Sequence, residues 1–207
     1  MCSGFAGDDS LAISITTPSA ISAEFNANIG PAPASSLASR SCTLVSSAST
    51  VAGVRGASLL KGREHADTTL VADHIARACT SREIFKSVLD GESRSVFQGK
   101  IIVRPGAQKT DGKMMAQALL LSENAEADNK PELEIFADDV QCGHGATAGA
   151  LDQNLLFYLK ARGIPQAEAE ALLIQAFVGE AIETLEHEGV KDGLMGAAAE
   201  WLGSRKQ

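Results

Sequence analysis

Hydrophobic periodicity changes abruptly at Gly149. From Ala57 to Ala148 the chain consists of short β-like runs separated by Gly, Asp, Asn and Pro, and no long amphipathic helix interrupts them. The runs are Ser58–Leu60, Thr68–Ala72, Ser95–Val103, Ala118–Leu121 and Leu133–Val140. The stretch Thr80–Asp90 is ambiguous, because its apolar residues also fit helical spacing. This half of the chain is therefore mainly β, and its pattern fits a sandwich, a barrel or a β-solenoid.

Beyond Gly149 the pattern predicts helices. Asp152 is a suitable N-cap for a helix that ends at about Arg162, before Gly163. Pro165 then suits the first position of a second helix, which runs to about Glu188. The apolar stripe of this helix comprises Leu172, Leu173, Ala176, Phe177, Ala181 and Leu185, and a third, short helix holds Leu194, Ala198, Trp201 and Leu202. We interpret the stripes mainly as core packing, with remaining apolar surface left for a partner.

The first 54 residues differ from the rest. Ser and Ala make up about two-fifths of the first 50 residues, whose only charged side chains are Asp8, Asp9, Glu24 and Arg40. A single arginine does not fit an organellar transit peptide. We leave residues 1–54 unassigned, either as a poorly ordered segment, as weak strands, or as an artefact of a truncated or shifted reading frame.

Charge and cysteine usage narrow the function classes. Eighteen Lys and Arg against 26 Asp and Glu give a net charge of −8, which disfavours binding to nucleic acid or to anionic membrane surfaces. No apolar run is long enough to span a bilayer. The four cysteines (Cys2, Cys42, Cys79 and Cys142) form no Cys-x-x-Cys pair, and we see no secretory leader. We therefore expect a reducing, cytoplasmic compartment without disulfides.

The densest polar group, residues 137–147, lies where the two halves of the chain meet. If this segment is a strand, Asp138, Val140, Cys142 and His144 share one face, with the thiol and the imidazole about 7 Å apart. These two side-chain types suit iron, zinc and iron–sulfur clusters. A buried thiol beside a hydrogen-bonded histidine is the plainer interpretation of the same pair. Asp138 and Asp139 offer hard oxygen ligands for iron, or mark a solvated strand edge.

Five ordered blocks of sequence together resemble the SufB/SufD family of iron–sulfur cluster assembly proteins, and its SufD branch in particular. The resemblance runs from about His65 to about Glu188 and corresponds to the carboxy-terminal part of a family member. The blocks are Val96–Ile101, Gly106–Gly112, Asp128–Ile135, Asp138–Thr147 and Leu156–Ile164. A SufB-type protein carries a cysteine in the stretch that matches Met114–Leu121, and its absence here favours the SufD branch.

The resemblance implies a right-handed parallel β-helix, here partial, followed by a small helical domain. It also implies a non-enzymatic subunit of the SUF machinery, paired with a SufB-like subunit and with SufC-like ATPases on the helical domains. Within this picture His144, with Cys142 as a helper, would build a nascent cluster. The chain alone would hold no stable cofactor, only a transient cluster or iron in the complex. Tyr158, Leu172, Leu173 and Phe177 would contribute to partner binding.

We accordingly divide the chain into the unassigned segment 1–54, a partial β-helix over 55–148 and a helical domain over 149–207. The rival interpretations are a β-helix enzyme acting on carbohydrate, and an inactive fragment. Adjacent Asp138 and Asp139 would point to opposite faces of a strand, which is poor geometry for two cooperating carboxylates. No phosphate-binding GxxxxGK[ST] loop and no GxSxG nucleophile motif occurs.

Overall fold

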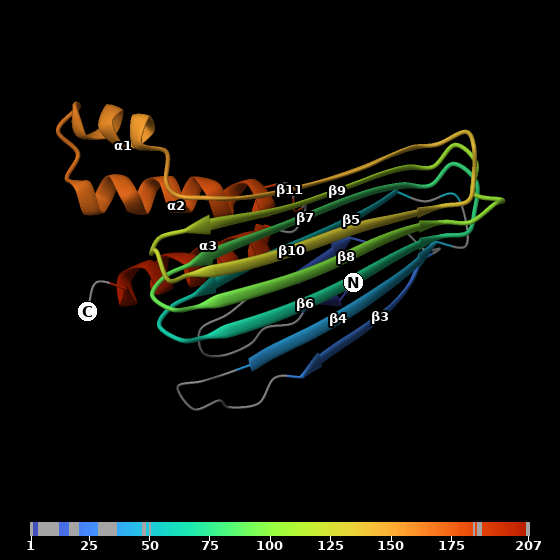
Figure 1. Ribbon diagram of the computed structural model, residues 1–207, viewed down its shortest axis with the longest axis horizontal. Coiled ribbons are helices and arrows are strands. Elements are labelled where there is room, and N and C mark those ends of the chain that lie inside the picture. Colours follow the sequence, from blue (N-terminus) through green and yellow to red (C-terminus); the bar gives the residue numbers. More distant parts are fainter. Residues whose placement is uncertain are drawn as a thin grey trace.

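In the computed structural model the chain forms two facing sheets, with three helices after the last strand (Figure 1). The structure describes residues 2–3, 13–16, 21–28, 37–46, 49, 51–183, 185 and 188–205. The strands are β1 (Cys2–Ser3), β2 (Ile13–Thr16), β3 (Ile21–Asn28), β4 (Leu37–Ser46), β5 (Val51–Leu60), β6 (His65–His74), β7 (Thr80–Leu89), β8 (Arg94–Val103), β9 (Asp111–Leu120), β10 (Glu126–Ile135) and β11 (Gln141–Gly149).

From β4 onward the chain alternates between the two sheets. One sheet has the order β1-β2-β5-β7-β9-β11 and the other β10-β8-β6-β4-β3. All pairs between β4 and β11 are parallel and in register, so that each turn of the chain stacks on the one before. This arrangement confirms the predicted parallel β-helix followed by helices, and the stacked parallel rungs are those of a solenoid rather than of an antiparallel sandwich or barrel.

The ambiguous stretch is a strand, β7. Its apolar residues mimic helical spacing because both faces of the strand are covered near its end. Phe85 packs inside the β-helix, whereas Val88 packs outside it against the helices. Tertiary burial on two sides thus produced a pattern that alternation alone does not predict.

Regular structure begins before the expected division at residue 54. β4 pairs in parallel with β6, and β5 pairs in parallel with β7, so both belong to the β-helix. β2 and β3 extend the two sheets by antiparallel pairing with β5 and β4. The remaining positions of 1–54 lie outside the described residues, and the proposed division into domains stays a prediction.

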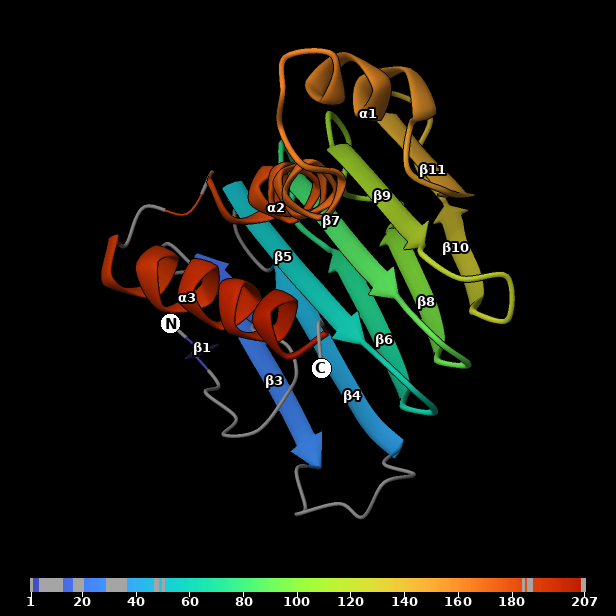
Figure 2. The same ribbon diagram turned by 90° about the vertical axis from the view of Figure 1, so that its left-hand side faces the viewer.

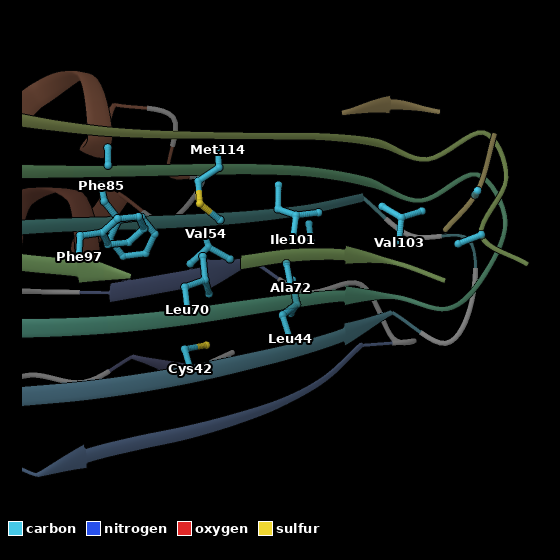
Figure 3. Packing of buried hydrophobic residues seen from close by; sticks show 14 residues of the cluster. Cys42, Leu44, Val54, Leu70, Ala72, Phe85, Phe97, Ile101, Val103 and Met114 are labelled. Carbon is cyan, nitrogen blue, oxygen red and sulfur yellow. The ribbon is translucent and has the colours of Figure 1, made fainter. Parts of the chain in front are cut away.

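The interior of the β-helix contains a large apolar cluster (Figure 3). The rings of Phe85 and Phe97 approach with centroids 4.5 Å apart, and Met114 lies beside them. Gly99 provides the space for this packing, because a Cβ at that position would collide with Met114 Sδ and lie 2.8 Å from the Phe97 ring. Met114 and Phe97 can therefore pack where they do because residue 99 has no side chain.

The helices are α1 (Gln153–Lys160), α2 (Gln166–Ile182) and α3 (Glu188–Ser204). Asp152 caps α1 as predicted, its carboxylate accepting hydrogen bonds from the amides of Asn154 and Leu155. Gly163 adopts the positive φ of 85° that favours glycine after a helix. The second helix is shorter than expected, ending at Ile182, and the third is longer.

α2 and α3 cover the outer face of the sheet over β5 and β7 (Figure 2). The buried side of α2 carries Ile174, Val178 and Ile182, together with the predicted Ala181. The buried face of α2 is therefore rotated about the helix axis relative to the predicted apolar stripe. Leu172 of that stripe is exposed, and Leu173 and Phe177 are only half-buried. Ala198, Trp201 and Leu202 of α3 are buried as expected.

One buried cation joins the helices to the β-helix. Lys86 of β7 is almost fully buried, its ammonium pairs with Glu180 of α2, and it lies 4.2 Å from the centroid of the Phe177 ring. The Glu180 side chain is largely exposed. Removal of Glu180 therefore leaves a buried, unpaired cation, whereas removal of Lys86 leaves a carboxylate that water can solvate.

We expect Glu180→Ala to lower the free energy of unfolding by about 1–3 kcal/mol, because it leaves the Lys86 ammonium buried without its carboxylate. Lys86→Met should cost less, because the remaining carboxylate is hydrated and the apolar stem is kept. Urea unfolding of the two variants measures the difference. Equal losses, or a larger loss for Lys86→Met, would contradict this account of the contact.

Candidate functional site

Cys142 and His144 lie on β11, the last rung of the β-helix. In the register of β9 and β11, Cys142 is opposite Gly112 and His144 is opposite Met114. Gly112 and Met114 are buried positions of β9 that face the interior. Because side chains alternate along a strand, Cys142 and His144 both face the inner side of the same end of the β-helix.

The two side chains differ in exposure. His144 is exposed, because β11 is the last strand of its sheet and no described strand covers it. Cys142 is half-buried and packs against the interior core, with its Sγ 3.6 Å from the point where a Gly112 Cβ would lie. The end of the β-helix therefore presents an imidazole to solvent and keeps a thiol beneath it.

Burial raises the pKa of the Cys142 thiol. The nearby charges of Asp111 and Glu83 also raise this pKa, and a hydrogen bond with the backbone of Gly112 opposes them. At neutral pH Cys142 is thus held as a thiol, which is a poorer metal ligand and nucleophile than a thiolate. Its use as a ligand requires the loss of a proton.

The donor set on this chain is small. Within the described ranges, no three His, Cys, Asp or Glu side chains come together in a group suited to holding a metal ion. His144 and Cys142 supply one nitrogen and one sulfur, whereas iron–sulfur centres commonly use four protein ligands. These two donors are fewer than such a centre commonly uses.

Asp138 and Asp139 do not lie on a strand. β10 ends at Ile135 and β11 begins at Gln141, and both aspartates are exposed in the turn between them. Asp139 pairs with Lys109, and its amide donates to the side-chain oxygen of Gln108 at 2.9 Å. Of the four residues expected on one strand face, only Cys142 and His144 lie on a strand, whereas Asp138 and Val140 precede it. Asp139 makes contacts that stabilise the turn.

The predicted partner-binding residues differ in exposure. Tyr158 of α1 is 53% exposed and stacks under the Arg162 guanidinium, while Leu172 of α2 is 42% exposed. Leu173 and Phe177 are half-buried, and Phe177 packs against the core between the helices and the sheet. Phe177 is accordingly better placed to hold the helices on the β-helix than to meet a partner.

Sequence reasoning missed two features. Phe157 of α1 is 74% exposed, the most exposed large apolar side chain among the described residues. The sequence indication for this exposure was that Phe157 lies about 100° around the helix axis from Leu156, which is the buried residue of α1. The other is Glu83, a fully buried carboxylate at an inward position of β7, which only the strand register reveals.

No helix among the described residues has both the length and the hydropathy needed to cross a membrane.

Comparison with known proteins identifies the family. Residues 27–177 match the family described as "SUF system FeS cluster assembly, SufBD core domain". The chain is 44% identical over 132 residues to the iron–sulfur cluster assembly protein SufD of Escherichia coli. These aligned residues make up 64% of this chain and 31% of the relative. It is 35% identical over 135 residues to SufD of Bacillus subtilis, with coverages of 65% and 31%.

A SufBD family protein of Synechocystis is 38% identical over 129 residues, which are 61% of this chain and 28% of the relative. The chain thus spans about a third of the length of the curated relatives it matches. Since the matched core domain covers most of the 207 residues, and the relatives include two SufD proteins, the chain belongs to the SufB/SufD family of SUF iron–sulfur cluster assembly proteins and is SufD-like.

Proposed function

We propose that this chain acts as a non-enzymatic, SufD-like subunit in iron–sulfur cluster assembly, working with a SufB-like subunit and a SufC-like ATPase in the cytoplasm. The observation that carries the proposal is the pair His144 and Cys142 on the inner side of the last rung, with too few donors to hold a cluster alone. His144 supplies the exposed ligand, and Cys142 supplies a second one once its thiol has lost a proton. Iron acquisition follows from the same pair, because imidazole and thiolate both bind iron.

The SufB-like partner is assigned to the open end of the β-helix. β10 and β11 are the last strands of their sheets, so that one edge of each has no described strand beside it. Unpaired strand edges are ready templates for pairing with another chain. A partner strand placed there would also bring its own ligands next to His144.

The SufC-like partner is assigned to the exposed large apolar side chains of α1 and α2. We call this group of side chains the helical patch, and it comprises Leu155, Phe157, Tyr158 and Leu172. These four side chains are exposed although they are large and apolar, and such groups commonly mark interaction surfaces. Aromatic residues are enriched at the energetic centres of interfaces.

We expect the chain to co-purify with a SufC-like ATPase, and Phe157→Ser combined with Leu172→Ser to weaken that binding about tenfold or more, because exposed apolar anchors are lost. Isothermal titration calorimetry measures the affinity, with and without nucleotide. The matched control is Ile75→Ser, which removes an exposed apolar side chain from the turn after β6. It should bind normally.

Absence of binding in every nucleotide state would overturn the assignment of the ATPase to this chain. Equal weakening by the Ile75→Ser control and by the double variant would show that the helical patch is not the contact. Circular dichroism of the variants checks that helix content is unchanged.

A further inference from the structure

Glu83 is a carboxylate enclosed in the apolar interior of the β-helix. Its exposed fraction is 0%, and neither carboxylate oxygen makes a hydrogen bond of normal geometry with the described residues, although the Ser81 hydroxyl and the Glu83 amide lie close enough to favour the charged form. In the strand register Glu83 lies between Val54 of β5 and Met114 of β9, both buried members of the core. A buried carboxylate without hydrogen bonds is costly when charged and much less costly when protonated.

The groups around Glu83 do not form a closed ion pair with it. On its own strand Ser81 and Arg82 are near, and Arg55 of β5 also attracts the charged form, but burial outweighs them and raises the pKa of Glu83 to about 7. Across the interior, His74 of β6 shares a hydrogen bond of 2.9 Å with the Ser81 hydroxyl. His74 also shares one of 2.9 Å with the Ser46 hydroxyl of β4.

The other titratable neighbours add no countercharge. Burial lowers the pKa of His74, so this ring is neutral at neutral pH. On the far side, the Cys142 thiol of β11 lies within electrostatic range of Glu83, as it does of Asp111 on β9. Loss of the Glu83 proton therefore places a negative charge among mostly apolar side chains, and the Ser81 hydroxyl, the Glu83 backbone amide, Arg55 and Arg82 together compensate less than burial costs.

Glu83 is also linked to the end of the β-helix through the register of neighbouring strands. Glu83 is opposite Met114, and Met114 is opposite His144, so these residues form one row across β7, β9 and β11. Water drawn to a charged Glu83 would have to enter between these rungs. In a solenoid each rung is held only by its neighbours, so loosening at β9 reaches β11 directly.

We propose that Glu83 is a proton-controlled switch in the β-helix interior: when protonated it lets the last rungs pack tightly, and when ionised it loosens β9 and β11, which carry the exposed His144. This inference does not depend on a role in cluster assembly. The sign follows from the raised pKa. Stabilisation by Glu83 is fully present below the unfolded value near 4.5 and is lost as pH rises through about 7.

His74 acts in the opposite direction, because a lowered pKa in the folded state gives stability that is fully present above the unfolded value of 6.5 and is lost as pH falls through the lower folded value. His74 is present in both the wild type and a variant at residue 83, so its contribution cancels when their pH responses are compared. The comparison of Glu83→Gln with the wild type therefore isolates the effect of Glu83.

The test is amide hydrogen exchange of the full chain at about pH 6 and about pH 8.5, corrected for intrinsic exchange rates. In the wild type, protection of β7, β9 and β11 should fall about tenfold or more at the higher pH, since a tenfold change corresponds to one pKa unit. Glu83→Gln, which stays neutral and nearly isosteric, should keep its protection. Glu200→Gln, an equal charge change on the exposed side of α3, should behave like the wild type.

An equal protection of these strands at both pH values in the wild type, or an unchanged pH response in Glu83→Gln, would overturn the proposal. If Glu83→Gln does not fold, infrared spectroscopy of the wild type decides instead. A protonated carboxyl band that disappears near neutral pH supports the switch, and the absence of any such carboxyl refutes it.

Discussion

His144→Ala is expected to abolish iron–sulfur cluster formation in a complex reconstituted from this chain with SufB- and SufC-like subunits, while the complex itself still assembles. The imidazole is the exposed donor of the last rung, and Cys142 is held as a thiol, so this rung offers no ready replacement among the described residues. Iron and sulfide content and the visible absorbance of the purified complex measure the loss. Cys142→Ala should reduce cluster formation less, because a protonated thiol contributes less as a ligand.

The matched control is Thr147→Ala, an exposed position on the same strand but on its other face. It should build clusters at the wild-type rate. Truncating an exposed side chain typically changes stability by no more than about 0.5 kcal/mol, so His144→Ala should unfold like the wild type. Unfolding of the variant would point to a structural histidine, and a normal rate of cluster formation would remove His144 from the site.

The fold was predictable where the sequence carried local signals. The change in periodicity at Gly149, the cap at Asp152 and the glycine stop at Gly163 each have a local physical cause, and the structure has all three. The resemblance to the SufB/SufD family then chose the β-helix among the possible β architectures. The positions of Cys142 and His144 on one strand face also followed from simple alternation.

Long-range contacts decided the features that local patterns did not predict. β7 mimicked a helix because helices cover its outer face near Val88. The stripe of α2 was rotated because Ile174 and Val178, rather than Leu172, meet the sheet. Asp138 and Asp139 fell in a turn since β10 ends early, at Ile135. No local pattern marks Glu83 as internal, since a single charged residue in a strand ordinarily faces solvent.

The second large effect is expected at Gly99, where a side chain would collide with the packed interior. Gly99→Val should lower the free energy of unfolding by about 3 kcal/mol, at the upper end of overpacking costs, because the new side chain must displace Met114 and the Phe97 ring. Met114 is flexible and can move, but the Phe97 ring is held against Phe85. Urea unfolding followed by circular dichroism measures the loss.

Gly143→Val is the matched control, since it makes the same change on a strand of the same β-helix. A Cβ at Gly143 meets nothing within 4 Å, and valine suits a strand, so this variant should be as stable as the wild type or slightly more stable. The pair separates overpacking from the general effect of replacing glycine in a strand. If Gly99→Val were no less stable than Gly143→Val, the sheets could not be as closely packed at Met114 as the structure has them. The row that links Glu83 through Met114 to His144 would then be looser than the interior switch requires.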